Sequence, residues 1–321
     1  MHQFTMENSI SLSSRMKDKL QPQFFIQPLE LLESTNSIYL MGSCFSDAML
    51  SRFHQRNISA NSNPFGTIYH PIPLLNELKK IIDLIPQKTV SQKYSMDNIS
   101  GETITNTNFF EFNSTFHSLP HAYKFSNANP SELVQLISNT QKTAAQHIEK
   151  ASTIIITLGT AWYYQHIPTQ SIVGNCHKLP GQQFEKICST VGEIKQLLHD
   201  FLSQCTTTLP NKNWIFTVSP VRHLRDGISQ NLQSKSTLLC AIHELLSENK
   251  YTHVSYFPAY EILQEELNDF RFFKDDLMHP SSWTEDYIFQ RFIETYYSQT
   301  EQEQLATNFK NWKQNQHITK K

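Results

Sequence analysis

Two short segments, far apart in the sequence, carry the residue types of a catalytic nucleophile and its base. Ser43 and Cys44 follow Gly42 at the point where an apolar run ends, and Asp276 and His279 stand three residues apart near the other end of the chain. A carboxylate at that spacing can accept the imidazole Nδ1–H, fix the tautomer and stabilise the imidazolium that forms in catalysis. The sequence therefore predicts a nucleophile at Cys44 or Ser43, assisted by His279 and Asp276.

The chemistry of the turn at Gly42 depends on the helix expected after it. Apolar residues recur at helical spacing over 45–53, so a helix N-terminus would lie next to the thiol. The partial positive charge there would lower the pKa of Cys44 and favour the thiolate. Both segments also have a structural interpretation, with Cys44 as a small buried hydrophobe and the loop at Asp276 as a helix cap.

Glycines mark two further turns in a chain that has only 8 of them. Gly66 and Gly159 stand where a turn begins or an apolar run ends, and such turns can present backbone N–H groups to an oxyanion. An ordinary turn is the alternative at each position. His177, His223 and Cys176 lack the spacing of a metal-ligand pair, so neither a metal nor another cofactor is expected.

The elements that must position these residues alternate between strands and helices. Short β-branched or aromatic runs predict strands at 37–41, 152–158, 213–219 and 252–257. Apolar stripes predict helices that include 74–82, 191–202, 238–246 and 283–292. This alternation favours a mostly parallel sheet covered on both faces, with ligands bound outside the carboxyl ends of the strands.

The same pattern predicts how the chain is divided. We expect an N-terminal extension over 1–35, one α/β domain over 36–298 and a polar C-terminal tail over 299–321. Asn, Ser, Thr and Phe are abundant over about 86–130, where periodicity is weak, so this stretch is expected to be an insertion or lid. In the tail, Leu305, Phe309 and Trp312 could form one helical stripe that packs on the domain.

Charge and composition exclude several classes of protein. With 27 Lys and Arg against 29 Asp and Glu, the net charge is −2, which disfavours nucleic-acid binding. No apolar stretch is long enough for a membrane span. Five cysteines without CxxC spacing, and no signal-peptide core in the first 40 residues, predict a cytoplasmic protein. No oligomeric state is predicted.

Taken together, the motifs resemble the GSCFA family, which is grouped with the SGNH (GDSL-type) hydrolases. The resemblance covers roughly residues 30–295 and implies a flavodoxin-like three-layer αβα sandwich with a nucleophile after the first strand and an Asp-x-x-His near the end. The matching segments are Gly42-Ser43-Cys44-Phe45-Ser46, Asn63-Pro64-Phe65-Gly66, Thr157-Leu158-Gly159-Thr160-Ala161-Trp162, Asn175-Cys176-His177-Lys178-Leu179-Pro180, Thr217-Val218-Ser219-Pro220-Val221-Arg222-His223, Tyr256-Phe257-Pro258-Ala259-Tyr260-Glu261 and the loop from Asp276 to His279.

The resemblance also assigns roles to the candidate residues. Aligned on Gly-Asp-Ser, Cys44 takes the nucleophile position and Ser43 that of the aspartate. Gly66 corresponds to the second-block glycine, an oxyanion donor, with the Cys44 amide as a further backbone donor. Ala161 stands where the third-block Gly-x-Asn has its asparagine, so one donor is missing. Either Asn63 or Asn175 replaces that donor, or the activity is weak or different.

These implications lead to two functional hypotheses. The first is an SGNH-like hydrolase or acyltransferase that acts on a small-molecule or carbohydrate ester, with carbohydrate O-acyl groups as the substrate class. The second is a non-catalytic binding or assembly protein that retains the scaffold, because Ala161 replaces the asparagine of the wider SGNH pattern and the aspartate of that pattern is absent.

Overall fold

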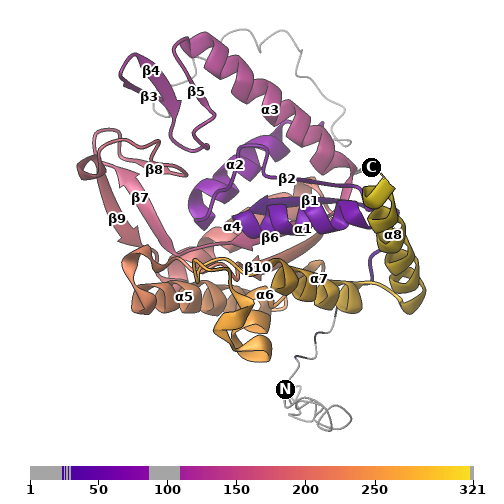
Figure 1. Ribbon diagram of the computed structural model, residues 1–321. Helices are drawn as coiled ribbons and strands as arrows, with labels where there is room; N and C mark the ends of the chain where they lie inside the picture. The colour runs from indigo at the N-terminus through magenta and orange to yellow at the C-terminus, as the bar shows by residue number, and fades with distance from the viewer. Residues whose placement is uncertain (1–23, 25, 27, 29, 87–108, 319–321) are drawn as a thin grey trace.

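The central sheet of the computed structural model has five parallel strands in the order β11-β10-β6-β1-β2 (Figure 1). The structure describes residues 24, 26, 28, 30–86 and 109–318. The strands are β1 (Ser37–Gly42), β2 (Ala60–Ser62), β6 (Ala151–Leu158), β10 (Asn213–Val218) and β11 (Val254–Tyr256). All four predicted strands are confirmed, and the strand order is the flavodoxin-like one.

Helices cover both faces of this sheet, which confirms the three-layer sandwich. Along β1, Ile38 and Leu40 pack into one apolar core, and Tyr39 and Met41 pack into the other. The first core is closed by α1 (Cys44–Gln55), α6 (Ala259–Glu261), α7 (Ser282–Tyr296) and α8 (Gln299–Ile318). The second is closed by α2 (Pro71–Asp83), α3 (Pro130–Lys150), α4 (Val191–Thr208) and α5 (Ile228–Ser247).

The register of the sheet brings three strand ends to one level. Gly42 pairs with Thr157, and Thr157 pairs with Thr217, so β1, β6 and β10 finish side by side. Because the strands are parallel, the segments that leave them begin at the same edge. The motifs at Gly42, Gly159 and Ser219 therefore start close together in space.

Two small antiparallel sheets lie on the same side of the central sheet (Figure 1). One consists of β3 (Phe109–Phe112), β4 (Thr115–Ser118) and β5 (Ser126–Asn127). It occupies part of the insertion expected at about 86–130, whose residues 87–108 lie outside the described residues. The other consists of β7 (Trp162–His166), β8 (Ser171–Val173) and β9 (Phe184–Cys188), which sequence periodicity did not predict.

Short turns of helix complete the chain. They are η4 (Gly181–Gln183), η5 (Leu224–Asp226), the π-helix η6 (Ile262–Leu267) and η7 (Phe270–Phe272). The polar tail forms α8, in which Leu305 is buried and Phe309 packs against the Arg56 guanidinium, 4.4 Å from the ring centroid. Within the described part of the chain, no helix has the length and apolar character needed to span a membrane.

Candidate active site

The turn between β1 and α1 is held against the neighbouring strand. Gly42 has a φ of +137°, and a Cβ at this position would lie 2.1 Å from the carbonyl oxygen of Thr157. Only glycine fits such a close approach of two backbones. The Ser43 N–H then donates to the same carbonyl oxygen over 3.1 Å. The first residue of α1, Cys44, is thereby fixed at the carboxyl edge of the sheet.

Ser43 and Cys44 have different surroundings. Ser43 is fully buried, and its Oγ accepts a hydrogen bond from the Phe45 N–H over 3.2 Å, so it serves as the N-cap of α1. Cys44 is half-buried and lines a cavity. Of the two predicted nucleophiles, the geometry therefore favours Cys44.

The Asp276 loop has the predicted arrangement of carboxylate and imidazole. His279 Nδ1 lies 2.7 Å from Asp276 Oδ2, and the other carboxylate oxygen accepts the backbone N–H groups of Met278 (2.8 Å) and His279 (2.9 Å). These hydrogen bonds hold the pKa of Asp276 at about 2. The backbone N–H of Arg222 donates a hydrogen bond to the Met278 carbonyl oxygen over 2.9 Å, which links the loop to the segment after β10.

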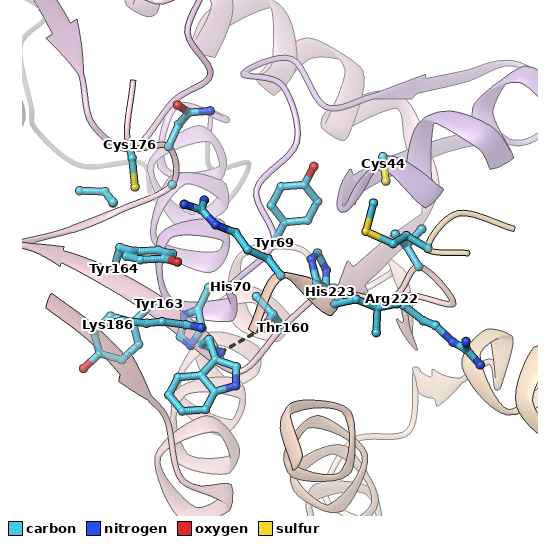
Figure 2. A pocket seen from close by; sticks show the side chains of 18 of the residues that line it. Cys44, Tyr69, His70, Thr160, Tyr163, Tyr164, Cys176, Lys186, Arg222 and His223 are labelled. Atoms are coloured by element: carbon cyan, nitrogen blue, oxygen red, sulfur yellow. Dashed lines mark hydrogen bonds between the residues drawn. The ribbon is translucent and has the colours of Figure 1, made fainter. Parts of the chain in front are cut away.

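One cavity of about 450 Å³ brings the two ends of the sequence together (Figure 2). Cys44 and His279 both line it, from α1 and from the loop before α7. Among the described residues, His279 Nε2 has no hydrogen-bond partner. The lining also includes Tyr69, His70, Thr160, Trp162, Tyr163, Tyr164, Asn175, Cys176, Lys186, Arg222, His223, Arg225 and Met278.

Neither predicted glycine contributes an N–H to this cavity. The Gly66 N–H donates to the Asn63 carbonyl over 2.9 Å, and the Gly159 N–H donates to the Tyr69 carbonyl over 2.8 Å. Neither glycine is among the residues that line the cavity. Gly66 has a φ of +80°, and a Cβ there would lie 2.5 Å from the Ala122 Cβ, so its small size serves packing.

The two candidate asparagines lie in different parts of the structure. Asn63 holds the β1–α1 turn, because its Oδ1 accepts the Gly42 N–H over 2.8 Å and its Nδ2 donates to Asp47 Oδ1 over 2.9 Å. Asn175 lines the cavity and uses Oδ1 to accept the His177 N–H over 2.8 Å. Of the two asparagines, only Asn175 lines the cavity.

The thiol of Cys44 is less acidic than the helix N-terminus alone predicts. Burial raises its pKa, and the nearby Asp47 carboxylate raises it further. Hydrogen bonding to its own backbone N–H and the charge of Lys235 act in the opposite direction but do not offset these effects. The expected lowering of the Cys44 pKa is therefore wrong for the free protein.

Lys235 on α5 is a functional candidate that the sequence did not single out. It is completely buried, and its Nζ donates to the carbonyl oxygens of Gly159 (2.7 Å) and Ser219 (2.8 Å). Burial lowers the pKa of this ammonium to about 7. Lys235 thus joins the segments that leave β6 and β10, close enough to Cys44 for their charges to interact.

An aromatic wall is the second feature that sequence reasoning missed. Trp162, Tyr163 and Tyr164 come from β7, and Tyr69 comes from the segment before α2 (Figure 2). The Trp162 indole N–H donates to the Gln230 carbonyl over 3.2 Å, and Lys186 Nζ lies 4.6 Å from the centroid of its ring. The run of three aromatic residues after Ala161 was the available signal.

The Asn175-to-Lys178 segment is held by a histidine contact. His177 Nε2 donates to the Ser118 carbonyl over 2.7 Å, and its ring lies beside that of His117, with centroids 5.2 Å apart. This contact holds the segment against β4 and places Asn175 and Cys176 at the cavity. Within the described ranges, no three His, Cys, Asp or Glu side chains form a group that could hold a metal ion.

Three solved structures resemble the chain at low sequence identity, each over 85% of its length. A family two carbohydrate esterase from Clostridium thermocellum, in complex with cellohexaose, has 11% identity and a TM-score of 0.35 over 66% of its chain. A carbohydrate esterase family 2 enzyme with a carbohydrate binding domain, from Corynascus thermopiles (Myceliophthora fergusii), has 9% identity and a TM-score of 0.38 over 67%. An acetyl xylan esterase from the rumen bacterium Butyrivibrio proteoclasticus has 11% identity and a TM-score of 0.40 over 65%.

The chain thus spans about two thirds of the length of these structures, and a likeness this distant does not bear on substrate or mechanism. No curated protein matches the sequence. The GSCFA family model matches residues 37–292, which include the β1–α1 turn, all five strands of the central sheet and the Asp276 loop. The chain belongs to the GSCFA family.

Proposed function

We propose that this protein hydrolyses or transfers the acyl group of an ester, with Cys44 as nucleophile, His279 as general base and Asp276 as the residue that orients the imidazole. One observation carries the proposal. Cys44 and His279, 235 positions apart in the numbering, line the same cavity, and Asp276 Oδ2 fixes His279 Nδ1 at 2.7 Å. This arrangement leaves Nε2 available for the proton of the nucleophile.

The first half of the reaction forms an acyl-enzyme. Because the pKa of Cys44 is raised, His279 Nε2 removes the thiol proton as the sulfur attacks the ester carbonyl. A C–S bond forms, and the carbonyl electrons move to its oxygen, for which we propose the Cys44 N–H and the Asn175 side chain as hydrogen-bond donors. When the oxyanion collapses, the C–O bond breaks and His279 returns the proton to the departing alcohol.

The second half releases the acyl group. Water or an acceptor hydroxyl attacks the thioester carbon while His279 removes its proton. Collapse of this intermediate breaks the C–S bond, and the proton returns to the Cys44 sulfur. Hydrolysis and transfer differ only in the attacking hydroxyl.

Carbohydrate O-acyl groups are the substrate class that we propose. A cavity of about 450 Å³ falls within the range usual for small-molecule sites. The rings of Tyr69, Trp162 and Tyr164 offer flat apolar surfaces against which the C–H face of a sugar can pack. We further propose a reducing, cytoplasmic setting, because all five cysteines are free and a thiol nucleophile must stay reduced.

A non-catalytic binding protein is the second candidate function, and the occupied N–H groups of Gly66 and Gly159 favour it. Turnover of 4-nitrophenyl acetate by the wild type, Cys44→Ala and His279→Ala separates the two. A catalytic site predicts turnover by the wild type and its loss in both variants, with all three proteins folded by circular dichroism. Absence of turnover above buffer in the wild type would favour the binding protein.

A further inference from the structure

Among the described residues, the charged side chains that line the cavity are cationic. Its lining includes the cationic side chains of Lys186, Arg222 and Arg225, and none of the residues that line it is an aspartate or glutamate. The whole chain has a net charge of −2, so this bias does not follow from its composition. A cavity with cationic walls attracts anions and concentrates them.

Arg222 is already engaged within the protein. Its guanidinium lies 4.1 Å from the centroid of the Phe273 ring and donates to Gln264 Oε1 over 3.4 Å. Figure 2 shows this side chain directed away from Tyr69, Tyr163 and Tyr164. Arg222 therefore does not supply the charge that faces a ligand on the aromatic wall.

Arg225 is an exposed cation of the cavity. Arg225 lies in η5, in the segment that follows β10; its side chain is exposed, and no carboxylate in the described part of the chain forms an ion pair with it. Its positive charge acts on the thiol of Cys176, which places it near the Asn175 segment. Lys186 Nζ lies 4.6 Å from the Trp162 ring centroid and 6.0 Å from that of Tyr164, along the aromatic wall.

We propose that Arg225 forms a subsite in this cavity for an anionic group of the substrate, either a carboxylate or a phosphate. The planar fork of an arginine suits both groups, and the neighbouring aromatic rings receive the rest of the molecule. The substrate class is then an acyl ester of an acidic or phosphorylated sugar. That the substrate is an ester rests on the proposed function, whereas the anion subsite rests on the charges that line the cavity.

The subsite is tested by measuring the binding of sugars that are not substrates for the proposed reaction. Isothermal titration calorimetry with glucose, glucuronate and glucose 6-phosphate, at low and high salt, compares a neutral sugar with a carboxylate and a phosphate. The proteins are the wild type, Arg225→Gln and the matched control Arg271→Gln. Arg271 is an exposed arginine outside the cavity, so its replacement removes the same charge elsewhere. Turnover of 4-nitrophenyl acetate, a neutral ester, is measured in each preparation.

The proposal predicts that one of the anionic sugars binds at least about tenfold more tightly than glucose, the size expected of one charge-assisted hydrogen bond. Arg225→Gln should abolish this preference, Arg271→Gln should retain it, and the preferred anion identifies the group. Equal binding of all three sugars, no binding of any of them, or a preference that survives Arg225→Gln would overturn the subsite. Turnover of the neutral ester reports on the catalytic proposal separately, because that ester has no anion for Arg225.

Discussion

His279 Nδ1 and Asp276 Oδ2 are 2.7 Å apart, and the second oxygen of the same carboxylate holds the backbone of the loop. The carboxylate therefore has two functions, which a substitution can separate. Asp276→Asn retains an oxygen for the backbone N–H groups but cannot stabilise an imidazolium. We expect kcat for 4-nitrophenyl acetate to fall by about 10²- to 10⁴-fold with the fold retained. The control variant Asp275→Asn, at the exposed residue before Asp276, should leave kcat unchanged.

The nucleophile is tested by two adjacent substitutions. Cys44→Ala removes the thiol that lines the cavity and should abolish turnover. Ser43→Ala removes the N-cap of α1 and should lower the free energy of unfolding by about 1 kcal/mol, with turnover retained in the folded protein. Steady-state kinetics and urea unfolding measure the two effects. The opposite pattern of activity would assign the nucleophile to Ser43.

The raised pKa of Cys44 predicts how its alkylation depends on pH. Because the folded protein holds the thiol proton more tightly than a free cysteine, little thiolate exists at neutral pH, and labelling by iodoacetamide should accelerate as the pH rises. Asp47→Asn removes a nearby negative charge and should increase the rate at pH 7.5 about three- to tenfold. Peptide mass spectrometry follows Cys44 against the exposed Cys240. An unchanged rate in Asp47→Asn would show that the Asp47 carboxylate does not raise the pKa of Cys44.

His70 predicts a loss of stability in acid. Burial lowers its pKa to about 3, while Nδ1 caps α2 by accepting the Ile72 N–H over 3.1 Å. The unfolded chain takes up a proton below pH 6.5 that the folded chain refuses, so stability falls as the pH drops from 6.5 towards 3. His70→Asn retains a helix cap. It should reduce the slope of the unfolding free energy against pH by up to about 1.4 kcal/mol per pH unit. Urea unfolding at several pH values measures it, and an unchanged slope would contradict the assignment.

The central sheet and the two ends of the candidate site follow from local sequence patterns. Apolar runs over 37–41 and 152–158 are long enough to indicate buried strands, and residues that follow parallel strands must meet at one edge. This logic placed Cys44 at the edge of the sheet. The Asp276 loop follows η7 and not a strand of the central sheet, so the prediction for His279 also needed the resemblance to the SGNH pattern with its Asp-x-x-His.

The sequence could not show which hydrogen-bonding groups are already occupied. Gly66 and Asn63 lie in a motif of the right residue types, but their N–H and amide groups are used by the turn itself. Such pairings depend on tertiary contacts between segments far apart in the chain. The pKa of Cys44 depends on Asp47 and Lys235 for the same reason, and the strands of β7 to β9 are too short and too exposed to give a strong alternating pattern.

Asn63 and Asn175 should respond differently to the same substitution. Asn175→Ala removes a side chain at the cavity and should lower kcat by about 10²- to 10³-fold with little change in stability, if its amide supplies the missing donor. Asn63→Ala removes three hydrogen bonds at the β1–α1 turn and should lower the free energy of unfolding by about 1–3 kcal/mol. Kinetics and urea unfolding on both variants compare the effects. Full activity in folded Asn175→Ala would show that its amide is not the missing donor.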